Sequence, residues 1–156
     1  MTAVRLTQQQ VGELHVEIGH RLAGAGQRYS PVRRAIIAAL ADADRPRSVA
    51  DLVAAVPGLA VSSAYRNLGV LADAGAVERV AAGDDAGRYE LAESVTEQHH
   101  HHLVCIGCGL VLDYEPPPEL ERTVVAGLDA VAQRSGFTPE SHRLDLFGRC
   151  TDCVGT

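Results

Sequence analysis

The sequence lacks any apolar run long enough to cross a membrane. A membrane-spanning helix needs about 20 consecutive apolar residues, and every apolar stretch here falls well short of that length. A secretory signal pattern is also missing, because the polar stretch Thr7-Gln8-Gln9-Gln10 follows the first residues directly. Hydrophobic residues make up 46% of the chain, which suffices for a packed core. We therefore expect a soluble, cytoplasmic protein with no membrane partner.

Motifs of familiar catalytic sites are absent as well. The chain contains no His-Glu-x-x-His motif, no phosphate-binding loop and no pattern around a catalytic serine or cysteine. Lysine is also absent, so all 14 basic residues are arginines. We therefore expect that the protein is not an enzyme and does not bind a small organic substrate.

The formal net charge of −6 hides an asymmetry between the two halves of the chain. Residues 1–80 contain nine arginines and seven acidic residues, a net +2, whereas residues 81–156 contain five arginines and thirteen acidic residues, a net −8. Such a difference indicates two halves with different partners. The first half can approach phosphates, and the second suits a cation.

Residues 1–91 are expected to form a helical domain closed by a β-hairpin. Apolar periodicity, together with serine or proline start signals and glycine stop signals, predicts four helices. They cover residues 8–24, a segment opening at Ser30-Pro31, a short segment opening at Ser48, and residues 62–74. Short strands at 77–80 and 88–91 flank a Gly/Asp loop at 83–87. This order is typical of a winged helix-turn-helix.

Residues 92–98 are polar and are expected to be a hinge, followed by a second domain at 99–156. The elements predicted in that domain are strands at 102–105 and 110–114, a helix at 119–134, and a strand at 142–147, where the side chains alternate. Strand, strand, helix and strand make a small α/β domain. The whole chain is therefore expected to have an α+β fold.

Four cysteines form two Cys-x-x-Cys pairs, Cys105 with Cys108 and Cys150 with Cys153. Two thiolates three residues apart on a tight turn reach one ion, and a second pair completes a tetrahedral zinc site. A reducing cytosol disfavours disulfides as the alternative. We predict a structural zinc that ties the end of the chain to the start of the second domain.

Four consecutive histidines, residues 99–102, precede the first cysteine pair. Because alternate side chains of a strand face opposite ways, His100 and His102 would point to one side, and His99 and His101 to the other. One strand could therefore serve two separate metal sites. A purification tag or a solvated polar run is the alternative, but the histidines lead directly into the strand that carries Cys105.

The helix at 62–74 has an apolar face and, at about 100° per residue, an opposite polar face. The polar face carries Ser63, Arg66 and Asn67, together with Val70, and Tyr65 lies at its margin. Such polar side chains read base edges and phosphates in a major groove. Any surface helix has a polar face, but the hairpin that follows this one favours DNA binding.

Five segments resemble, in order, the ferric uptake regulator family of metal-dependent repressors, and among them most closely the zinc uptake regulators. They span about residues 25–153. They are Arg28-Tyr-Ser-Pro-Val-Arg33, Tyr65-Arg-Asn-Leu-Gly-Val-Leu71 with Asp73-Ala-Gly75, Arg88-Tyr-Glu-Leu91, His99-His-His-His-Leu-Val-Cys-Ile-Gly-Cys-Gly109 and Cys150-Thr-Asp-Cys153.

The resemblance implies a homodimer that binds a palindromic double-stranded DNA operator when its regulatory metal is bound. In such a repressor, one helix of each subunit enters the major groove, and an arginine and a tyrosine upstream of it lie near the DNA backbone. The DNA-binding residues that we expect are Arg28, Tyr29, Arg33, Ser63, Tyr65, Arg66 and Asn67.

The resemblance also implies a structural zinc held by the four cysteines and two further metal sites. The regulatory site, between the domains, would use Glu90, His100 and His102, with Glu78 as an acidic ligand of the kind that zinc-responsive members use. An additional site on the dimerisation domain would use His99, His101, Glu121 and His142.

Two departures from the family affect the regulatory site. Many members have a histidine in the loop that here reads Arg45-Pro-Arg47, and zinc-responsive members have a cysteine near Ala92.

Histidine-rich sites accept zinc, iron(II), nickel and manganese. Zinc is our first expectation for the regulatory metal and iron(II) the second, and a peroxide-responsive regulator is a third alternative.

Two alternative functions from other classes remain, a zinc-dependent hydrolase and a zinc-buffering protein. In a zinc-dependent hydrolase, Glu90, His100 and His102 would surround an open zinc ion, but the helix-and-hairpin domain would then have no role. A zinc-buffering protein would bind the same ions and would not bind DNA. A DNA-binding assay with and without chelator separates both from a repressor.

Overall fold

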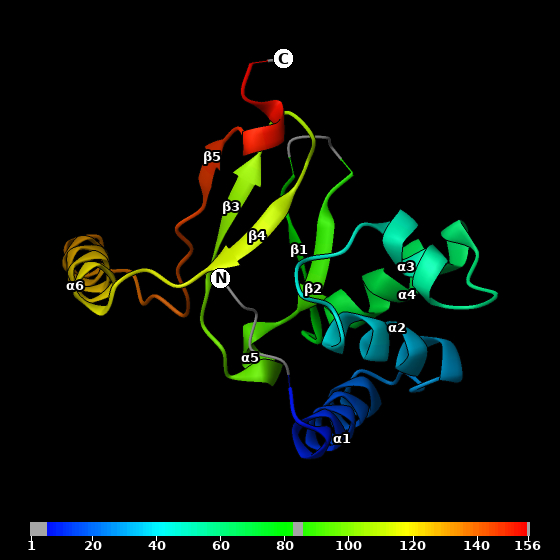
Figure 1. The fold of residues 1–156 in the computed structure, drawn as a ribbon. Coiled ribbons are helices and arrows are strands. Elements are labelled where there is room, and N and C mark those ends of the chain that lie inside the picture. The colour runs from blue at the N-terminus through cyan, green and yellow to red at the C-terminus, as the bar shows by residue number, and fades with distance from the viewer. Residues whose placement is uncertain (1–5, 83–85, 156) are drawn as a thin grey trace.

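The computed structural model describes residues 6–82 and 86–155. The predicted Gly/Asp loop therefore lies partly outside the described residues. The N-terminal part contains the helices α1 (Gln8–Gly24), α2 (Pro31–Ala41), α3 (Val49–Ala55) and α4 (Val61–Asp73), and the antiparallel strands β1 (Val77–Val80) and β2 (Arg88–Leu91). This is the helix-and-hairpin order predicted for a winged helix-turn-helix (Figure 1).

The first three helices begin at polar residues that cap their free amide groups. Thr7 and Ser48 each form a capping box with the residue three positions further on, and the Ser30 hydroxyl accepts from Arg33 N. Capping of this kind satisfies amide groups that have no partner within a helix. Helix α4 begins at Ala60 without a side-chain cap, so its position depends on packing.

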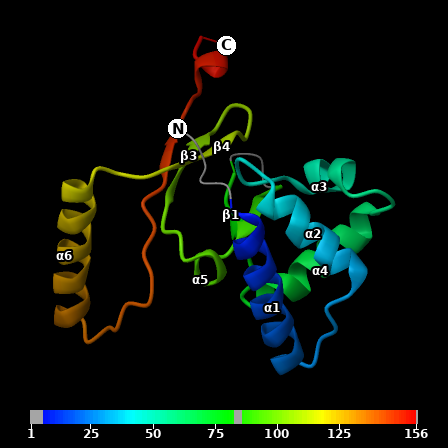
Figure 2. The same ribbon diagram turned by 60° about the horizontal axis from the view of Figure 1, so that its bottom comes forward.

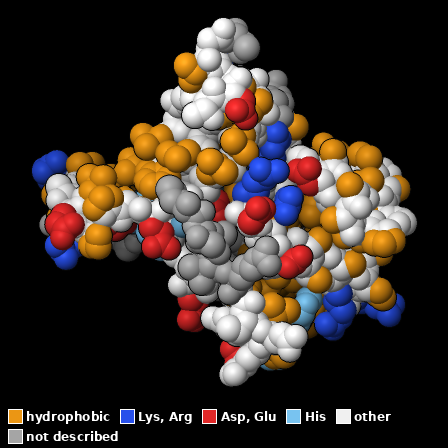
Figure 3. All heavy atoms as spheres, viewed as in Figure 1, with side chains coloured by type: hydrophobic (Ala, Val, Ile, Leu, Met, Phe, Trp, Pro, Cys, Tyr) orange, Lys and Arg blue, Asp and Glu red, His pale blue; other side chains and the backbone are white. Residues whose placement is uncertain are grey.

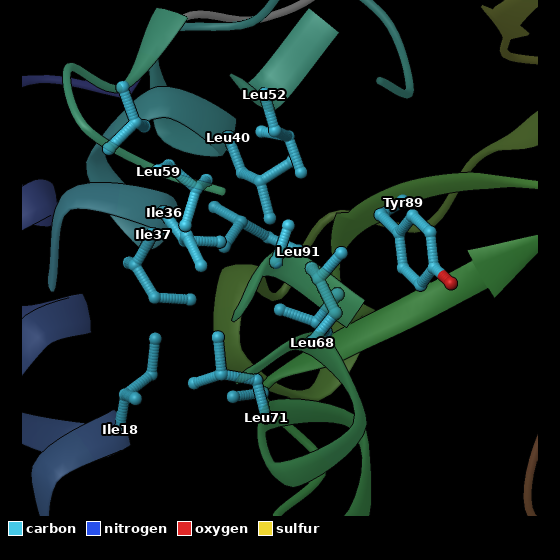
Figure 4. Packing of buried hydrophobic residues seen from close by; sticks show 14 of the residues in the cluster. Ile18, Ile36, Ile37, Leu40, Leu52, Leu59, Leu68, Leu71, Tyr89 and Leu91 are labelled. Carbon is cyan, nitrogen blue, oxygen red and sulfur yellow. The ribbon is translucent and has the colours of Figure 1, made fainter. Parts of the chain in front are cut away.

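The N-terminal core lies where the four helices meet the hairpin (Figure 4). Ile18, Ile36, Leu52, Leu68 and Leu71 are fully buried, at a gain of about 1.5–3 kcal/mol for each large apolar side chain. Helix α4 contributes most of its predicted apolar face to this core, which fixes the direction of its remaining surface.

Helix α4 is rotated relative to the sequence-based expectation. Asn67 was expected on the exposed polar face, but only 8% of it is exposed. Arg33 of α2 donates from Nε to Asn67 Oδ1 at 3.1 Å, which draws that side of α4 against α2. The solvent-facing centre of α4 is therefore at Tyr65 and Arg66, both of which are exposed.

The expected hinge contains a short helix, α5 (Glu93–Thr96). Its preceding residue, Ala92, donates its amide to Ala76 O at 3.1 Å, which ties the start of α5 to the end of α4. Helix α5 ends at Glu97, whose φ of 56° lies in the left-handed region. The segment is thus ordered by contacts with the N-terminal helices.

The C-terminal part contains a three-stranded sheet and one long helix. Its elements are β3 (His101–Cys105), β4 (Val111–Tyr114), α6 (Pro118–Arg134), β5 (Leu146–Gly148) and the 3-10 helix η1 (Thr151–Cys153). The strand order is β4-β3-β5, with β3 antiparallel to β4 and parallel to β5. Together with the N-terminal part, this confirms the predicted α+β fold class.

The last strand is shorter than the alternation at 142–147 predicted, because only Leu146–Gly148 pairs with β3. The backbone before it bonds to side chains instead: Leu144 N donates to His101 Nδ1 at 3.2 Å, and Leu144 O accepts from the Tyr114 hydroxyl at 2.8 Å. The alternation of hydrophobic residues therefore predicted that this segment contains a strand, but not the residue at which its pairing with β3 begins.

Helix α6 stands apart from the other helices, on the far side of the sheet (Figures 1 and 2). Leu120, Leu128 and Val131 are 44–50% exposed, although they form one apolar side of the helix. In Figure 3, hydrophobic side chains gather between α6 and the sheet. Within the described residues, no helix combines the length and apolarity that crossing a membrane requires.

Candidate metal centres and DNA-facing surface

The turn after β3 and the 3-10 helix η1 lie close together at the top of Figure 1, and these two segments and the residues adjoining them carry the four cysteines, which form one cluster. Their sulfur atoms all lie within 4.8 Å of one another, and Cys108 Sγ is 3.7 Å from Cys150 Sγ. Four thiolates around zinc, with bonds of about 2.3 Å, stand about 3.8 Å apart at the corners of a tetrahedron. None of the four cysteines forms a disulfide, so the geometry fits zinc.

Backbone amides favour the thiolate of Cys105, whereas hydrogen bonds with Cys150 and Cys108 raise the pKa of Cys153 to about 12 in the absence of a metal. Amide groups of Cys150 and Cys108 lower the pKa of the Cys105 thiol to about 6, and the Cys150 amide lies 3.2 Å from Cys105 Sγ. Metals bind the thiolate form. A Cβ on Gly107 would lie 3.0 Å from Cys153 Cβ, so glycine lets the first turn approach the second.

A second cluster brings together His99, His101, Glu121 and His142, the four residues of the additional site that the resemblance implied. The Glu121 carboxylate lies 3.0 Å from His101 Nε2 and 2.7 Å from His142 Nε2, and the His99 and His142 Nε2 atoms are 3.3 Å apart. His101 is fully buried. Helix α6 contributes the carboxylate, β3 and the segment just before it contribute two imidazoles, and the segment before β5 contributes the third.

A third cluster lies on the opposite side of β3 and joins Glu90, His100, His102 and Asp113. The Glu90 carboxylate is 3.2 Å from His100 Nε2 and 3.1 Å from His102 Nε2. Glu90 belongs to β2, whereas the other three residues follow α5 in the chain. An ion at this cluster would connect the hairpin directly to the C-terminal sheet.

Asp113 was missed by the sequence reasoning. It lies opposite His102 in the β3–β4 register, and its Oδ1 atom is buried without a hydrogen-bond partner. Burial raises the pKa of this carboxyl group. Because buried polar atoms almost always have a hydrogen-bond partner, a carboxylate oxygen that has none and lies 4.0 Å from His102 Nε2 fits a metal ligand. An aspartate that interrupts the apolar strand Val111–Tyr114 was the available signal.

Glu78 does not join this cluster, although it lies opposite Glu90 in the hairpin register. Its side chain is 42% exposed, and its carboxylate faces Arg143 Nη1 at 3.9 Å. The arginine draws Glu78 away from the imidazoles, so we replace it with Asp113 in the proposed ligand set.

The protonation states of the side chains in the third cluster depend on the hydrogen bonds that these side chains make with one another. Burial by itself would raise the pKa of Glu90, but hydrogen bonds with His100 and His102 outweigh it and lower the pKa to about 2. The hydrogen bond with Glu90 raises the pKa of His100 to about 9. Since a metal requires neutral imidazoles, its binding at this cluster releases protons.

The residues expected to contact DNA lie near one another on the N-terminal part, but they differ in their exposure to solvent. Arg28, Tyr65 and Arg66 are exposed. Asn67 is held by contacts with Ser63, whose backbone O accepts from Asn67 Nδ2 at 2.8 Å. Asn67 thereby presents its Oδ1 to an arginine of α2 and is turned away from solvent.

Two neighbouring side chains that the sequence analysis did not identify fix the position of Tyr29. Its hydroxyl lies 2.5 Å from His15 Nδ1 of α1, and the Arg34 guanidinium lies 4.1 Å above its ring centre. Burial raises the pKa of Tyr29 to about 12. The tyrosine is thus a neutral, fixed part of a surface that also carries exposed arginines.

A family model described as the ferric uptake regulator family matches residues 24–147. The chain belongs to the ferric uptake regulator family. Among curated relatives, the peroxide operon regulator of Bacillus subtilis (strain 168) is 30% identical over 136 residues, which cover 82% of this chain and 85% of that protein.

Solved structures share the fold. The Helicobacter pylori ferric uptake regulator superposes with a TM-score of 0.74 at 20% identity and covers 97% of each chain. A zinc uptake regulator in complex with zinc and DNA has a TM-score of 0.57 at 22% identity, over 96% of this chain and 97% of that one. These likenesses support the winged-helix domain and the second, dimerisation domain of the family.

Members of the ferric uptake regulator family are metal-responsive, DNA-binding transcriptional regulators and not enzymes. Membership therefore agrees with the functional class that the sequence predicted and argues against the hydrolase and zinc-buffer alternatives. Proteins of the family bind DNA as dimers. Family membership leaves the metal and its ligands to be argued from this chain.

Proposed function

We propose that this chain is a cytoplasmic, homodimeric repressor whose affinity for a palindromic operator rises when zinc binds Glu90, His100, His102 and Asp113. The observation that carries the proposal is the buried Asp113 Oδ1, which has no hydrogen-bond partner, in a cluster that spans both parts of the chain. Four protein ligands satisfy the tetrahedral preference of zinc.

The mechanism follows from where the four ligands are attached. Glu90 moves with the hairpin, and His100, His102 and Asp113 move with the C-terminal sheet. An ion bound by all four favours only those arrangements that hold the two parts together, and it shifts the population by its differential affinity for them. Couplings of this kind are typically about 1–3 kcal/mol, or roughly 5–150-fold in affinity.

Dimerisation would turn this ordering into DNA recognition. The exposed apolar side of α6 continues onto β5, where Leu146 and Phe147 are 54% and 60% exposed. We propose that a second copy covers this surface. Two copies of α4, each presenting Tyr65 and Arg66, would then be held near one helical turn of DNA apart, about 34 Å, or a multiple of it.

The other two clusters would have distinct roles. The four cysteines would hold a structural zinc with all its positions filled, and the cluster of Glu121 with its three histidines would hold an additional ion. All residues of both clusters follow α5 in the chain, so neither spans the two parts directly.

Iron(II) is the second candidate for the regulatory metal. Two carboxylates and two imidazoles also suit iron(II), and the relative named a peroxide operon regulator favours it. Since zinc has no redox chemistry, hydrogen peroxide would end DNA binding by the iron-loaded protein and spare the zinc-loaded protein.

The test is a selection of binding sites from random DNA duplexes with zinc, with iron(II) under anaerobic conditions, and with chelator. We expect a palindromic sequence to be enriched with zinc, and the affinity for it to fall at least tenfold in chelator. Equal affinity with and without metal would overturn the proposed switch, and enrichment with iron(II) alone would overturn the choice of zinc.

A further inference from the structure

Arg21 of α1 joins elements that are far apart in the chain. Its Nη1 donates to Gly75 O and to Ser94 Oγ, both at 2.8 Å, and its Nη2 donates to Ser94 O at 2.8 Å. Its Nε donates to Glu17 Oε1 at 2.7 Å. Four of the five guanidinium N–H groups are thus used, one on Glu17, one on Gly75 and two on Ser94.

The acceptor at Gly75 lies directly after α4, the helix proposed to enter the major groove. Gly75 has a φ of +67°, which favours glycine because other side chains are strained there. Its carbonyl accepts from Arg21, and Ser94 Oγ lies 3.4 Å from the same oxygen. The end of α4 is therefore fixed to α5 through one arginine side chain.

The other side of α5 faces the metal clusters. The Glu93 carboxylate accepts from the backbone amide of His100 at 3.2 Å and lies 3.0 Å from His99 Nδ1. His99 belongs to the additional cluster and His100 to the cluster between the two parts. Histidines that bind metals usually donate their other ring nitrogen to a carboxylate, which orients the ring.

We propose that α5 couples the metal sites to α4. Metal binding orders His99 and His100, and their contacts with Glu93 then fix α5. The contacts of Arg21 with Ser94 and Gly75 in turn fix the end of α4. Glu93 and Ser94 are adjacent residues of a four-residue helix, so fixing one fixes the other. Arg21, Glu93 and Ser94 act here as positioning residues and touch neither metal nor DNA. The inference rests on the metal-dependent function proposed above.

The experiment uses zinc alone as the probe and amide hydrogen exchange as the readout, on the full chain with its four-cysteine site loaded. In the unsubstituted protein, zinc should slow exchange at residues 99–102 and also at 72–77. In Arg21→Met, we expect the protection at 99–102 to persist and the zinc-induced slowing at 72–77 to fall at least fivefold.

Two further variants separate coupling from general damage. Glu17→Gln removes only the negative charge from the contact of Arg21 within α1 and should respond to zinc like the unsubstituted protein. Ser94→Ala keeps the backbone acceptor and should give an intermediate response at 72–77. Thermal unfolding of metal-free Arg21→Met verifies that the variant is folded, and Ser94→Ala carries the test if it is not.

The outcomes distinguish this inference from the proposed function. If zinc protects 99–102 but the Arg21→Met and Ser94→Ala variants keep full zinc-induced protection at 72–77, the coupling through Arg21 is overturned and the metal switch stands. If zinc slows exchange at neither segment of the unsubstituted protein, the proposed regulatory sites fail, and the coupling fails with them.

Discussion

Asp113→Asn tests the ligand on which the proposed regulatory site depends. The amide keeps the size of the side chain but removes the carboxylate, so zinc should bind much more weakly. For a group that merely orients a ligand, substitution costs about 10–100-fold in metal affinity, and loss of a ligand should reach at least the upper end of that range.

The expected change in stability follows from linkage. Zinc at 100 times its dissociation constant stabilises the folded protein by about 2.7 kcal/mol, and a site weakened 100-fold gives about 0.4 kcal/mol at the same concentration. The difference of about 2.3 kcal/mol corresponds to roughly 5–9 °C in Tm for a chain of this size. Without zinc, the Tm should fall little, because the buried Oδ1 of Asp113 has no hydrogen bond to lose and lies 4.0 Å from His102 Nε2.

The assay is thermal unfolding with and without zinc, with the four-cysteine site loaded in both cases. Glu78→Gln is the matched control, because it removes the acidic residue that the sequence favoured and the structure turns toward Arg143. It should keep the full zinc-induced rise in Tm. A zinc response that survives Asp113→Asn but is lost in Glu78→Gln would refute the ligand assignment.

Three other perturbations follow from local geometry. Gly107→Ala places a methyl group 3.0 Å from Cys153 Cβ, so zinc should leave the four-cysteine site faster in a chelator competition; Gly127→Ala, where nothing lies within 4 Å, should not change this rate. Asp51→Asn should lower the free energy of unfolding by about 0.3–1 kcal/mol at pH 7, because it removes a negative charge from the first turn of α3. The hydrogen bond with the N-cap serine lowers the pKa of Asp51 in the folded state; its stabilisation is therefore complete above the unfolded pKa of about 3.9 and is lost as the pH falls through the folded pKa. The difference from the unsubstituted protein in urea unfolding should accordingly shrink in strong acid, and a constant difference would contradict the assignment. Leu128→Arg, on the exposed side of α6, should convert the proposed dimer into a monomer in sedimentation, and an unchanged mass would exclude that surface.

The sequence predicted the elements well because their signals are local. Serine and proline at the starts of helices, glycine at their ends, and the apolar period of α4 depend only on near neighbours. Alternation along residues 99–102 likewise predicted that the histidines divide between two sides of a strand, and the structure brings them into two separate clusters.

Some residues were missed or placed differently by the sequence analysis. Their positions depend on contacts between segments that are distant in the chain. Asp113 joins its cluster through the register of β4 against β3, and Glu78 leaves it because Arg143, more than sixty residues away in the chain, lies beside it. Asn67 faces inward because of Arg33 on another helix. Register and side-chain pairing are set by tertiary packing, which a helical or strand period does not encode.

The two histidine clusters differ in what an ion at each could accomplish. The cluster of His99, His101, Glu121 and His142 lies wholly after α5, so an ion there orders the C-terminal part without holding the hairpin. Among the three clusters that the described residues form, the one with Glu90 alone spans the two parts. Filling the first cluster should therefore pre-order β3, which presents His100 and His102 on its other side, and so lower the entropic cost of binding the second ion. On this argument the two sites act in sequence, with the additional site as a facilitator and the Glu90 site as the switch.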